Sequence, residues 1–396
     1  MAKDVWITGI GLVTSLGEGL DTHWTALTTP GAKPVVDEAS YAPFPVHPLP
    51  ALELDRQIPK KGDQRQMEPW QRLGTYAAGL AIDNANARSL VADMHLVVAA
   101  GGGERDIAVD EALATEFATT SPASAWPQMN QRLATELRPT LFLAQLSNLL
   151  AGNISIVHGV TGSSRTFMGE EQAAADAVRI AALRLSEGRG GIALVGGAYA
   201  SQRWDMVLLY HLGGALWQGP FVPVSQRDGK GGFVGGAVAA FLVLETEEHA
   251  RARGATGYAR VAGVATDAVH RRGGGASAAA ATALWGKLGV PRDGSLGVLS
   301  GATGVGEAMT EERTFLDGVT AGRDAALRTT GSLIGHGVEA AFPANVALGA
   351  IALSRGGFYP PMDPADRGDA RAVHRVLVTG FGQWRGEALA LLEPVR

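Results

Sequence analysis

Short apolar runs that each lead into glycine recur along the chain. They are VWITGIG (5–11), LVVAAGGG (96–103), IALVGGA (192–198) and RVLVTGFG (375–382). A continuous apolar run of this length is typical of a buried strand, and glycine after it predicts a tight turn. We therefore expect four buried strands that end in turns.

Alanine-rich stretches with helical spacing lie between these runs, at 70–87, 172–186 and 339–353. Buried strands that alternate with helices predict an α/β protein with layered packing. The strand-plus-glycine pattern occurs in both halves and suggests a duplication, although the halves share little sequence. Residues 271–281 (RRGGGASAAAA) lack a strand pattern, so we expect a surface excursion there.

Composition is that of an ordinary globular protein. Of 396 residues, 46% are hydrophobic and 18% are charged, which allows a large core of two or three packed units. A net charge of −5 gives no overall attraction to nucleic acid. The first residues enter a strand pattern without a leader, and no apolar stretch reaches the roughly 18 residues of a membrane helix. We expect a cytoplasmic protein that binds neither nucleic acid nor membrane.

The chain contains no cysteine, which excludes disulfides, thiolate metal sites and thiol catalysis. Its nine histidines are scattered and none pairs with another at ligand spacing, so we expect no metal. The glycine clusters at 101–106 and 228–236 lack the dinucleotide and phosphate-loop patterns and are interpreted as turns. No cofactor is predicted.

Three segments carry a resemblance to a known family. They are VWITGIGLVTSLGEG, FVPVSQRDGKGGFVGGAVAAFLVLETEEHARARGA and GSLIGHGVEAA. Each is similar to a segment of the type II β-ketoacyl-acyl-carrier-protein synthases, and the matches follow the family's order along nearly the whole chain. The resemblance implies a thiolase-like fold, in which two similar βαβ-rich halves stack as five layers, α-β-α-β-α, usually as a dimer. We expect residues 1–250 to form the N-terminal half, with dimerisation and cap insertions, and 251–396 the C-terminal half.

In that family a cysteine at a helix N-terminus takes the acyl group, two histidines polarise the malonyl thioester, a lysine supports one histidine, and backbone amides hold the oxyanion. Counting back without gaps from GRGGIALVGG places the cysteine position on Glu171, which cannot form a thioester. His336 matches the second histidine. The resemblance therefore gives Glu171 and His336 as the two candidate catalytic residues.

The remaining family positions are degenerate. The first histidine position falls on Ser300 or Gly301, and the lysine position on Gly331. The family's C-terminal oxyanion loop corresponds here to a segment with Phe381 and Gln383, where Gln383 replaces the gating phenylalanine. Decarboxylases and chain-length factors of the family carry glutamine at the nucleophile position, so the replacement of cysteine by Glu171 has a precedent. This precedent favours loss of the condensation activity.

Two interpretations of Glu171 stay open: a carboxylate that fills the acyl-thioester position, or an ordinary acid in a first helical turn, where the helix dipole favours it. About eleven residues, 158–168, look inserted between a strand expected at 153–157 and the helix near residue 170. We interpret this insert as a loop near the dimer contact. Ser163 and Ser164 within it are possible replacement nucleophiles, and His158 is interpreted as a hydrogen-bonded residue at a strand end.

IPKKGDQRQMEPWQRLGTYAAGLA and AGNISIVHGVTGSSRTFMGEE resemble cysteine-lacking synthase paralogues that help to make the very-long-chain acyl group of lipid A. In comparable heterodimers the inactive subunit lends residues to the acyl tunnel of its partner, which implies Phe142 and Leu143 here. Lys60, Lys61 and Arg65 form a basic cluster suited to an acidic carrier protein, with surface charge as the alternative. Arg271 and Arg272 form a second cluster.

The sequence thus predicts a noncatalytic, length-setting subunit of a heterodimeric condensing enzyme, with an acyl carrier protein and an active synthase as partners. One alternative is a malonyl-carrier decarboxylase or weak synthase that uses Glu171 and His336. Another is an acyl-carrier binding protein that forms a homodimer.

Overall fold

The two halves of the chain repeat one strand arrangement in the computed structural model, which describes residues 2–101, 103, 105–227, 231–270 and 273–395. The first half contributes β1 (Val5–Thr14), β4 (His95–Ala99), β5 (Ser164–Phe167), β6 (Ile192–Tyr199) and β8 (Val238–Thr246). The second contributes β9 (Ala259–Thr266), β10 (Leu296–Ser300), β11 (Ala325–Thr329), β12 (Arg375–Phe381) and β13 (Glu387–Glu393). Their orders, β1-β8-β6-β4-β5 and β9-β13-β12-β10-β11, are the same sequence of first, fifth, fourth, second and third strand.

Strand directions repeat as well. In each half the first two pairings are antiparallel and the last two are parallel. The first strands of the halves, β1 and β9, pair at Trp6–Arg260 and Ile7–Ala259, so the two sheets join into one sheet of 11 strands that includes β2 (Gly17–Glu18). A separate two-stranded sheet contains β3 (Val46–His47) and β7 (Gly235–Gly236). The duplication suggested by the glycine pattern is therefore visible in the topology.

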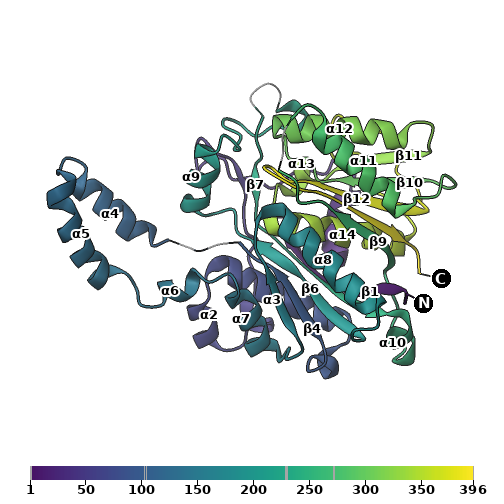
Figure 1. Cartoon of the computed structure of the whole chain (residues 1–396), viewed down its shortest axis with the longest axis horizontal. Helices are drawn as coiled ribbons and strands as arrows, with labels where there is room; N and C mark the ends of the chain where they lie inside the picture. The colour runs from purple at the N-terminus through teal and green to yellow at the C-terminus, as the bar shows by residue number, and fades with distance from the viewer. Residues whose placement is uncertain (1, 102, 104, 228–230, 271–272, 396) are drawn as a thin grey trace.

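Helices cover the sheets in layers (Figure 1). The helices α8 (Glu170–Ser186) and α14 (Ala341–Arg355) share one apolar core with strands of both halves. The outer helices α3 (Pro69–Asn84) and α7 (Leu149–His158) pack on the first half, and α11 (Ala276–Leu288) and α12 (Gly306–Thr320) pack on the second. The order is outer helices, sheet, central helices, sheet, outer helices, which is the predicted five-layered α/β arrangement.

Small residues make this close packing possible. Gly9 lies inside β1 opposite α3, where a Cβ atom would sit 2.5 Å from the carbonyl oxygen of Ala81. At Gly349 of α14 a Cβ atom would lie 2.9 Å from a methyl group of Leu392 and 3.0 Å from one of Val376. We expected such glycines to end their strands, and this is wrong for β1, which continues to Thr14. In β1 the glycine does not form a turn, because its role is to let the backbone of α3 approach closely.

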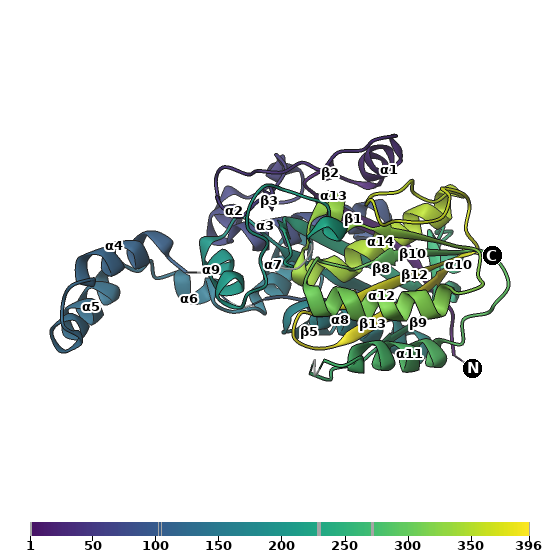
Figure 2. The same cartoon turned by 90° about the horizontal axis from the view of Figure 1, so that it is seen from above.

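A helical arm extends from the first half (Figures 1 and 2). It consists of α4 (Ile107–Phe117), α5 (Pro122–Glu136) and α6 (Leu141–Ala144). Leu113 and Ala125 are buried within it, whereas Trp126 and Phe142 are 67% and 70% exposed. The helices of the arm bury little apolar surface by themselves, so the arm presents large apolar side chains to its surroundings.

The shorter elements connect these layers. They are α1 (Leu20–Thr28), α2 (Lys61–Gln66), α9 (Trp204–Leu212), α10 (Glu247–Ala252), α13 (Gly331–Ile334), and the 3₁₀ turns η1 (Leu54–Arg56), η2 (Arg88–Leu90), η3 (Val224–Gln226) and η4 (Val338–Ala340). Within the described ranges, no helix is long and apolar enough to cross a membrane.

Three local predictions were wrong. The strand expected at 153–157 is the second half of α7, because Ile154 packs into the core beside α3. The insert at 158–168 is not all loop, since β5 forms within it and pairs with β4. The alanine end of 271–281 starts helix α11, and Arg271 and Arg272 lie outside the described residues.

Candidate functional site

A strand, a tight turn and a helix place Glu171 at the centre of the molecule. The strand β5 ends at Phe167, and α8 begins at Glu170, two residues beyond Met168. Gly169 has φ +120°, and Glu170 has φ +42°, a left-handed conformation that is uncommon for a residue with a side chain. Such strained turns are typical of functional sites.

The Glu171 side chain meets the imidazole of His336. Glu171 Oε1 lies 2.9 Å from His336 Nε2, and the two side chains are 12% and 6% exposed. The same carboxylate accepts hydrogen bonds from the backbone N–H groups of Gln383 and of Glu171 itself. An imidazole and two backbone amides thus surround one carboxylate, in the manner of an occupied oxyanion site.

Electrostatics keep this carboxylate ionised. Burial by itself would raise the pKa of Glu171, but the hydrogen bond and charge of His336, together with the two backbone amides, hold it below its ordinary value. His336 is fixed in turn by its backbone, which donates to the Val234 carbonyl at 2.8 Å and accepts from Gly236 N–H at 2.9 Å. The ring of Phe233 stands edge-on to the imidazole at 5.0 Å.

Little space remains beside the pair. The cavity that touches Glu171 and His336 measures about 20 Å³ and is closed by residues of α14 and β12, among them Phe342 and Phe381. A volume of this size is enough for about one water molecule. The centre therefore has no room for an acyl group in this conformation.

The family resemblance gives Ser300 or Gly301 as the position of the first histidine, and Gly301 has no space for a side chain. A Cβ atom on Gly301 would lie 2.6 Å from the carbonyl oxygen of Thr379, which is part of β12. Ser300 directs its hydroxyl to Glu312, at 2.8 Å, and lines a different cavity. No side chain fits at 301 unless β12 moves.

Gly331, which the family resemblance gives for the lysine, is similarly restricted. Gly331 starts α13, and a Cβ atom there would lie 2.9 Å from the Ala302 carbonyl oxygen and 3.3 Å from a methyl group of Val224. This position therefore supplies no lysine to support His336. The side chain of His336 is hydrogen-bonded to Glu171 instead.

The C-terminal loop closes over the helix start. Phe381 is buried and packs near Phe315, with ring centroids 6.1 Å apart. Trp384 stacks on Tyr210 at 5.6 Å with an interplanar angle of 8°. Arg385 forms an ion pair with Glu170, at 3.2 Å. The loop is thus held on both sides of Gln383, whose N–H reaches Glu171.

Sequence reasoning missed Glu339, which lies three residues after His336. This side chain is 5% exposed, and its Oε1 occupies space next to Gly101. Burial raises the pKa of Glu339 to about 7, and the charge of Glu171 acts in the same direction. The signal was an acid within the otherwise small and apolar run GVEAA.

The other predicted residues lie away from this centre. Phe142 projects from the arm, and the side chain of Leu143 is outside what the structure describes. Lys60, Lys61 and Arg65 are exposed beside or on α2, where Lys61 pairs with Asp55 at 2.5 Å.

The remaining polar candidates have other partners. Ser163 Oγ lies 2.7 Å from His95 Nδ1, and Ser164 is exposed in β5. His158 ends a helix rather than a strand, and its Nε2 lies 2.8 Å from the Thr75 carbonyl oxygen. Burial lowers the pKa of His158 to about 4, which is typical of a neutral core histidine.

Comparison with known proteins gives the class to which this fold and site belong. Residues 2–250 match the family described as "Beta-ketoacyl synthase, N-terminal domain". The chain belongs to the β-ketoacyl synthase family.

Particular relatives include the tetracenomycin polyketide synthase ketoacyl synthase beta subunit of Streptomyces glaucescens, 27% identical over 71% of this chain and 68% of that protein. A 3-oxoacyl-[acyl-carrier-protein] synthase 2 of Vibrio harveyi is 24% identical over 68% of this chain and 64% of its own length. The matches thus span about two thirds of each relative.

Solved structures share the fold over the whole chain. The ishigamide ketosynthase/chain length factor superposes with a TM-score of 0.81 at 20% identity, covering 100% of both chains. A type II polyketide synthase acyl carrier protein in complex with its ketosynthase gives a TM-score of 0.77 at 18% identity, again with full coverage. These likenesses establish a thiolase-like synthase fold.

Proposed function

We propose that this chain is a noncatalytic β-type subunit of a condensing enzyme, which pairs with a cysteine-bearing β-ketoacyl synthase and serves an acyl carrier protein. The main support for this proposal is the Glu171 carboxylate, which is hydrogen-bonded to His336 Nε2 and to the Gln383 N–H. The family resemblance implies an acylated thiolate at this position. The centre cannot hold an acyl group as a thioester, because it has no thiol.

The rival activity is decarboxylation of a malonyl-carrier thioester by Glu171 and His336. Geometry weighs against it, because polarising the thioester carbonyl requires hydrogen-bond donors that are free to bind substrate. His336 Nε2 and the Gln383 amide are already engaged by Glu171, and Gly301 offers neither a side chain nor room for one.

Two features support association with another subunit. The strand β5 is the terminal strand of the first half's sheet, and exposed strand edges are suited to pairing. The arm carries Trp126 and Phe142 on its surface, and exposed aromatic side chains are typical of protein interfaces. The beta-subunit relative and the ketosynthase/chain length factor neighbour agree with this role.

The finer assignments belong to the same proposal. We propose that Phe142 and Leu143 reach the acyl tunnel of the partner, that Lys60, Lys61 and Arg65 meet the acidic carrier, and that the product is a very-long-chain acyl group. The first two rest on exposure of the arm and of the α2 region. The chain-length assignment rests on the resemblance of the 58–81 and 151–171 segments alone.

The test is the native mass of the chain co-expressed with a cysteine-bearing synthase from the same genome. A one-to-one heterodimer is expected. The double variant Trp126→Ser with Phe142→Ser should weaken it, whereas Val35→Ser, which alters an exposed apolar residue outside the arm, should not. A homodimer that ignores the synthase, or carbon dioxide release from a malonyl carrier by the pure protein, would overturn the proposal.

A further inference from the structure

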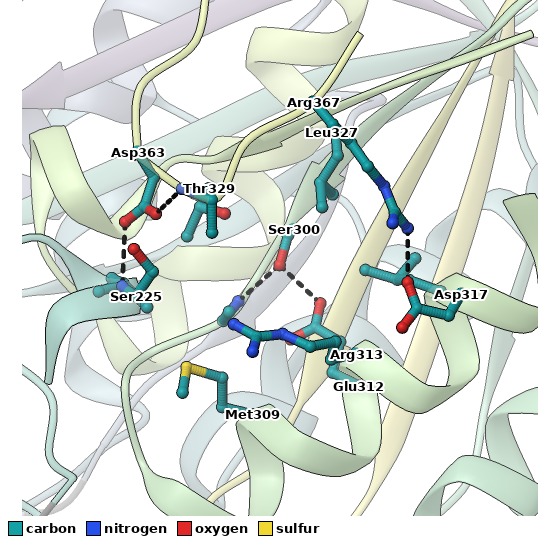
Figure 3. Close-up of a pocket in the computed structure, with 14 residues that line it drawn as sticks. Ser225, Ser300, Met309, Glu312, Arg313, Asp317, Leu327, Thr329, Asp363 and Arg367 are labelled. Carbon is teal, nitrogen blue, oxygen red and sulfur yellow. Dashed lines mark hydrogen bonds and ion pairs between the residues drawn. The ribbon is translucent and has the colours of Figure 1, made fainter. Parts of the chain in front are cut away.

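A second cavity, which shares no lining residue with the one beside Glu171, opens at the carboxyl ends of two parallel strands. Ser300 ends β10 and Thr329 ends β11, and the two residues are paired neighbours in the sheet. The crevice beyond such strand ends is the usual place for ligands in α/β proteins. This cavity, which we call the strand-end pocket, measures about 210 Å³ and also touches α12 and the loop around Asp363 (Figure 3).

Its walls are mainly apolar. Met309, Leu316 and Leu327 face the space together with Val224, Ala302 and Ala365. An apolar cavity of roughly 150 Å³ is enough to hold benzene, so this pocket suits a body of about six to eight carbon atoms. It is too small for a nucleotide or a long acyl chain.

The acids in the walls are already satisfied. Asp363 is 4% exposed and accepts hydrogen bonds from Ser225 N–H at 3.1 Å, Ser332 Oγ at 2.5 Å and Ala365 N–H at 2.9 Å. The Ser225 hydroxyl is a further donor, and these bonds hold the pKa of Asp363 below its ordinary value although burial alone would raise it. Glu312 accepts from the hydroxyls of Ser300 and Thr379.

The arginines at the mouth differ from each other. Arg367 is neutralised by Asp317 at 2.7 Å and also donates to Thr320. Arg313 is exposed and forms no ion pair or hydrogen bond within the described part of the chain. In Figure 3 the Arg313 side chain runs along the pocket between Ser300 and Met309. Its guanidinium keeps a full set of donors for a ligand.

From this arrangement we propose that the strand-end pocket binds a small organic monocarboxylate, with its apolar body against Met309, Leu316 and Leu327 and its carboxylate on Arg313. The buried carboxylates Asp363 and Glu312 repel an anionic group inside, so the charged end stays at the mouth. The site does not depend on Glu171 or on pairing with another subunit.

The probe is hexanoate, followed by NMR of the full chain labelled with ¹³C at the methionine methyl groups. Met309 lines the pocket and reports occupancy directly. We expect saturable, millimolar binding of hexanoate at Met309, and binding about tenfold weaker in Arg313→Gln, because a charge-assisted hydrogen bond is lost. Arg292→Gln, which removes another exposed arginine outside the pocket, should leave the affinity unchanged.

Hexanol and hexylammonium are the control ligands. They have an apolar chain similar to that of hexanoate but no carboxylate, so they test whether the pocket recognises the negative charge. Both should bind at least tenfold more weakly than hexanoate. Equal binding of either compound, no saturable shift at Met309, or an unchanged affinity in Arg313→Gln would overturn the proposal. None of these outcomes bears on the heterodimer, whose test is a native mass.

Discussion

The Nε2 atom of His336 lies 2.9 Å from Oε1 of Glu171, so an imidazole from one half of the chain touches a carboxylate from the other. These residues are 165 positions apart in sequence. The contact joins the start of α8 to the loop after α13, and the Gln383 amide completes the group. Where the family resemblance implies a reactive centre, this chain has a buried carboxylate that is hydrogen-bonded to an imidazole.

Removal of the carboxylate should destabilise the fold. Glu171→Ala leaves His336 and two backbone N–H groups without their acceptor in a buried site. We expect the free energy of unfolding to fall by about 3 kcal/mol, measured by urea denaturation. Glu170→Gln, which alters the partly exposed partner of Arg385, should cost less than about 1 kcal/mol. Equal losses would contradict a special role for the Glu171 pair.

Glu339 should make stability depend on pH. Its folded pKa of about 7 lies above its ordinary value, so between about pH 4.5 and 7 the folded state keeps a proton that the unfolded state releases. This contribution is complete below the ordinary pKa and is lost as the pH rises through 7. Glu339→Gln has no such proton, so the variant should gain roughly 3 kcal/mol over the wild type across that window.

Urea unfolding of both proteins across the window measures this difference. Glu171 cannot mimic the effect, because its pKa is lowered and its stabilisation is lost as the pH falls. A stability difference that stays constant with pH would show that Glu339 titrates normally.

A side chain added at Gly301, one of the two candidates for the first histidine position, should destabilise the fold. Gly301→Ala places a Cβ atom 2.6 Å from the Thr379 carbonyl, and overpacking against a strand backbone costs about 1–3 kcal/mol. The matched control is Gly286→Ala in α11, where a Cβ atom meets nothing within 4 Å and a helix gains about 0.5–1 kcal/mol. Thermal unfolding of the two variants should therefore move in opposite directions. If the Gly301→Ala protein were as stable as the wild type, the backbone of β12 would have to shift at little cost in free energy.

The C-terminal loop should open more often when either of two side-chain contacts that hold it is removed. Trp384→Ala removes the stack on Tyr210, and Arg385→Gln removes the ion pair with Glu170. Hydrogen exchange of residues 380–386 should accelerate in each variant, because the Gln383 amide is protected only while the loop is closed. Trp126→Ala, an exposed aromatic residue of the arm, serves as the control. Unchanged exchange in both loop variants would indicate that the backbone hydrogen bonds to Glu171 and to the Val269 carbonyl hold the loop.

Local sequence signals predicted most of the regular structure. The apolar runs at 192–198 and 375–382 are strands β6 and β12, and the alanine-rich stretches are α3, α8 and α14. The failure at 153–157 has a physical cause. Its β-branched residues favour a strand by propensity, but Ile154 is buried beside α3 only when the segment is helical. Tertiary packing therefore overrode a weak local preference.

The sequence by itself determined that no thiol is available, that a glutamate starts the central helix, and that the strand-plus-glycine pattern occurs in both halves. These features depend only on composition and on the local order of residues. Only the tertiary structure decided what Glu171 binds, that Gly301 has no room for a side chain, and that Glu339 is buried beside Gly101. Each of these depends on the approach of two segments far apart in the chain. That approach is fixed by how the two sheets pack on α8 and α14, which no local pattern specifies.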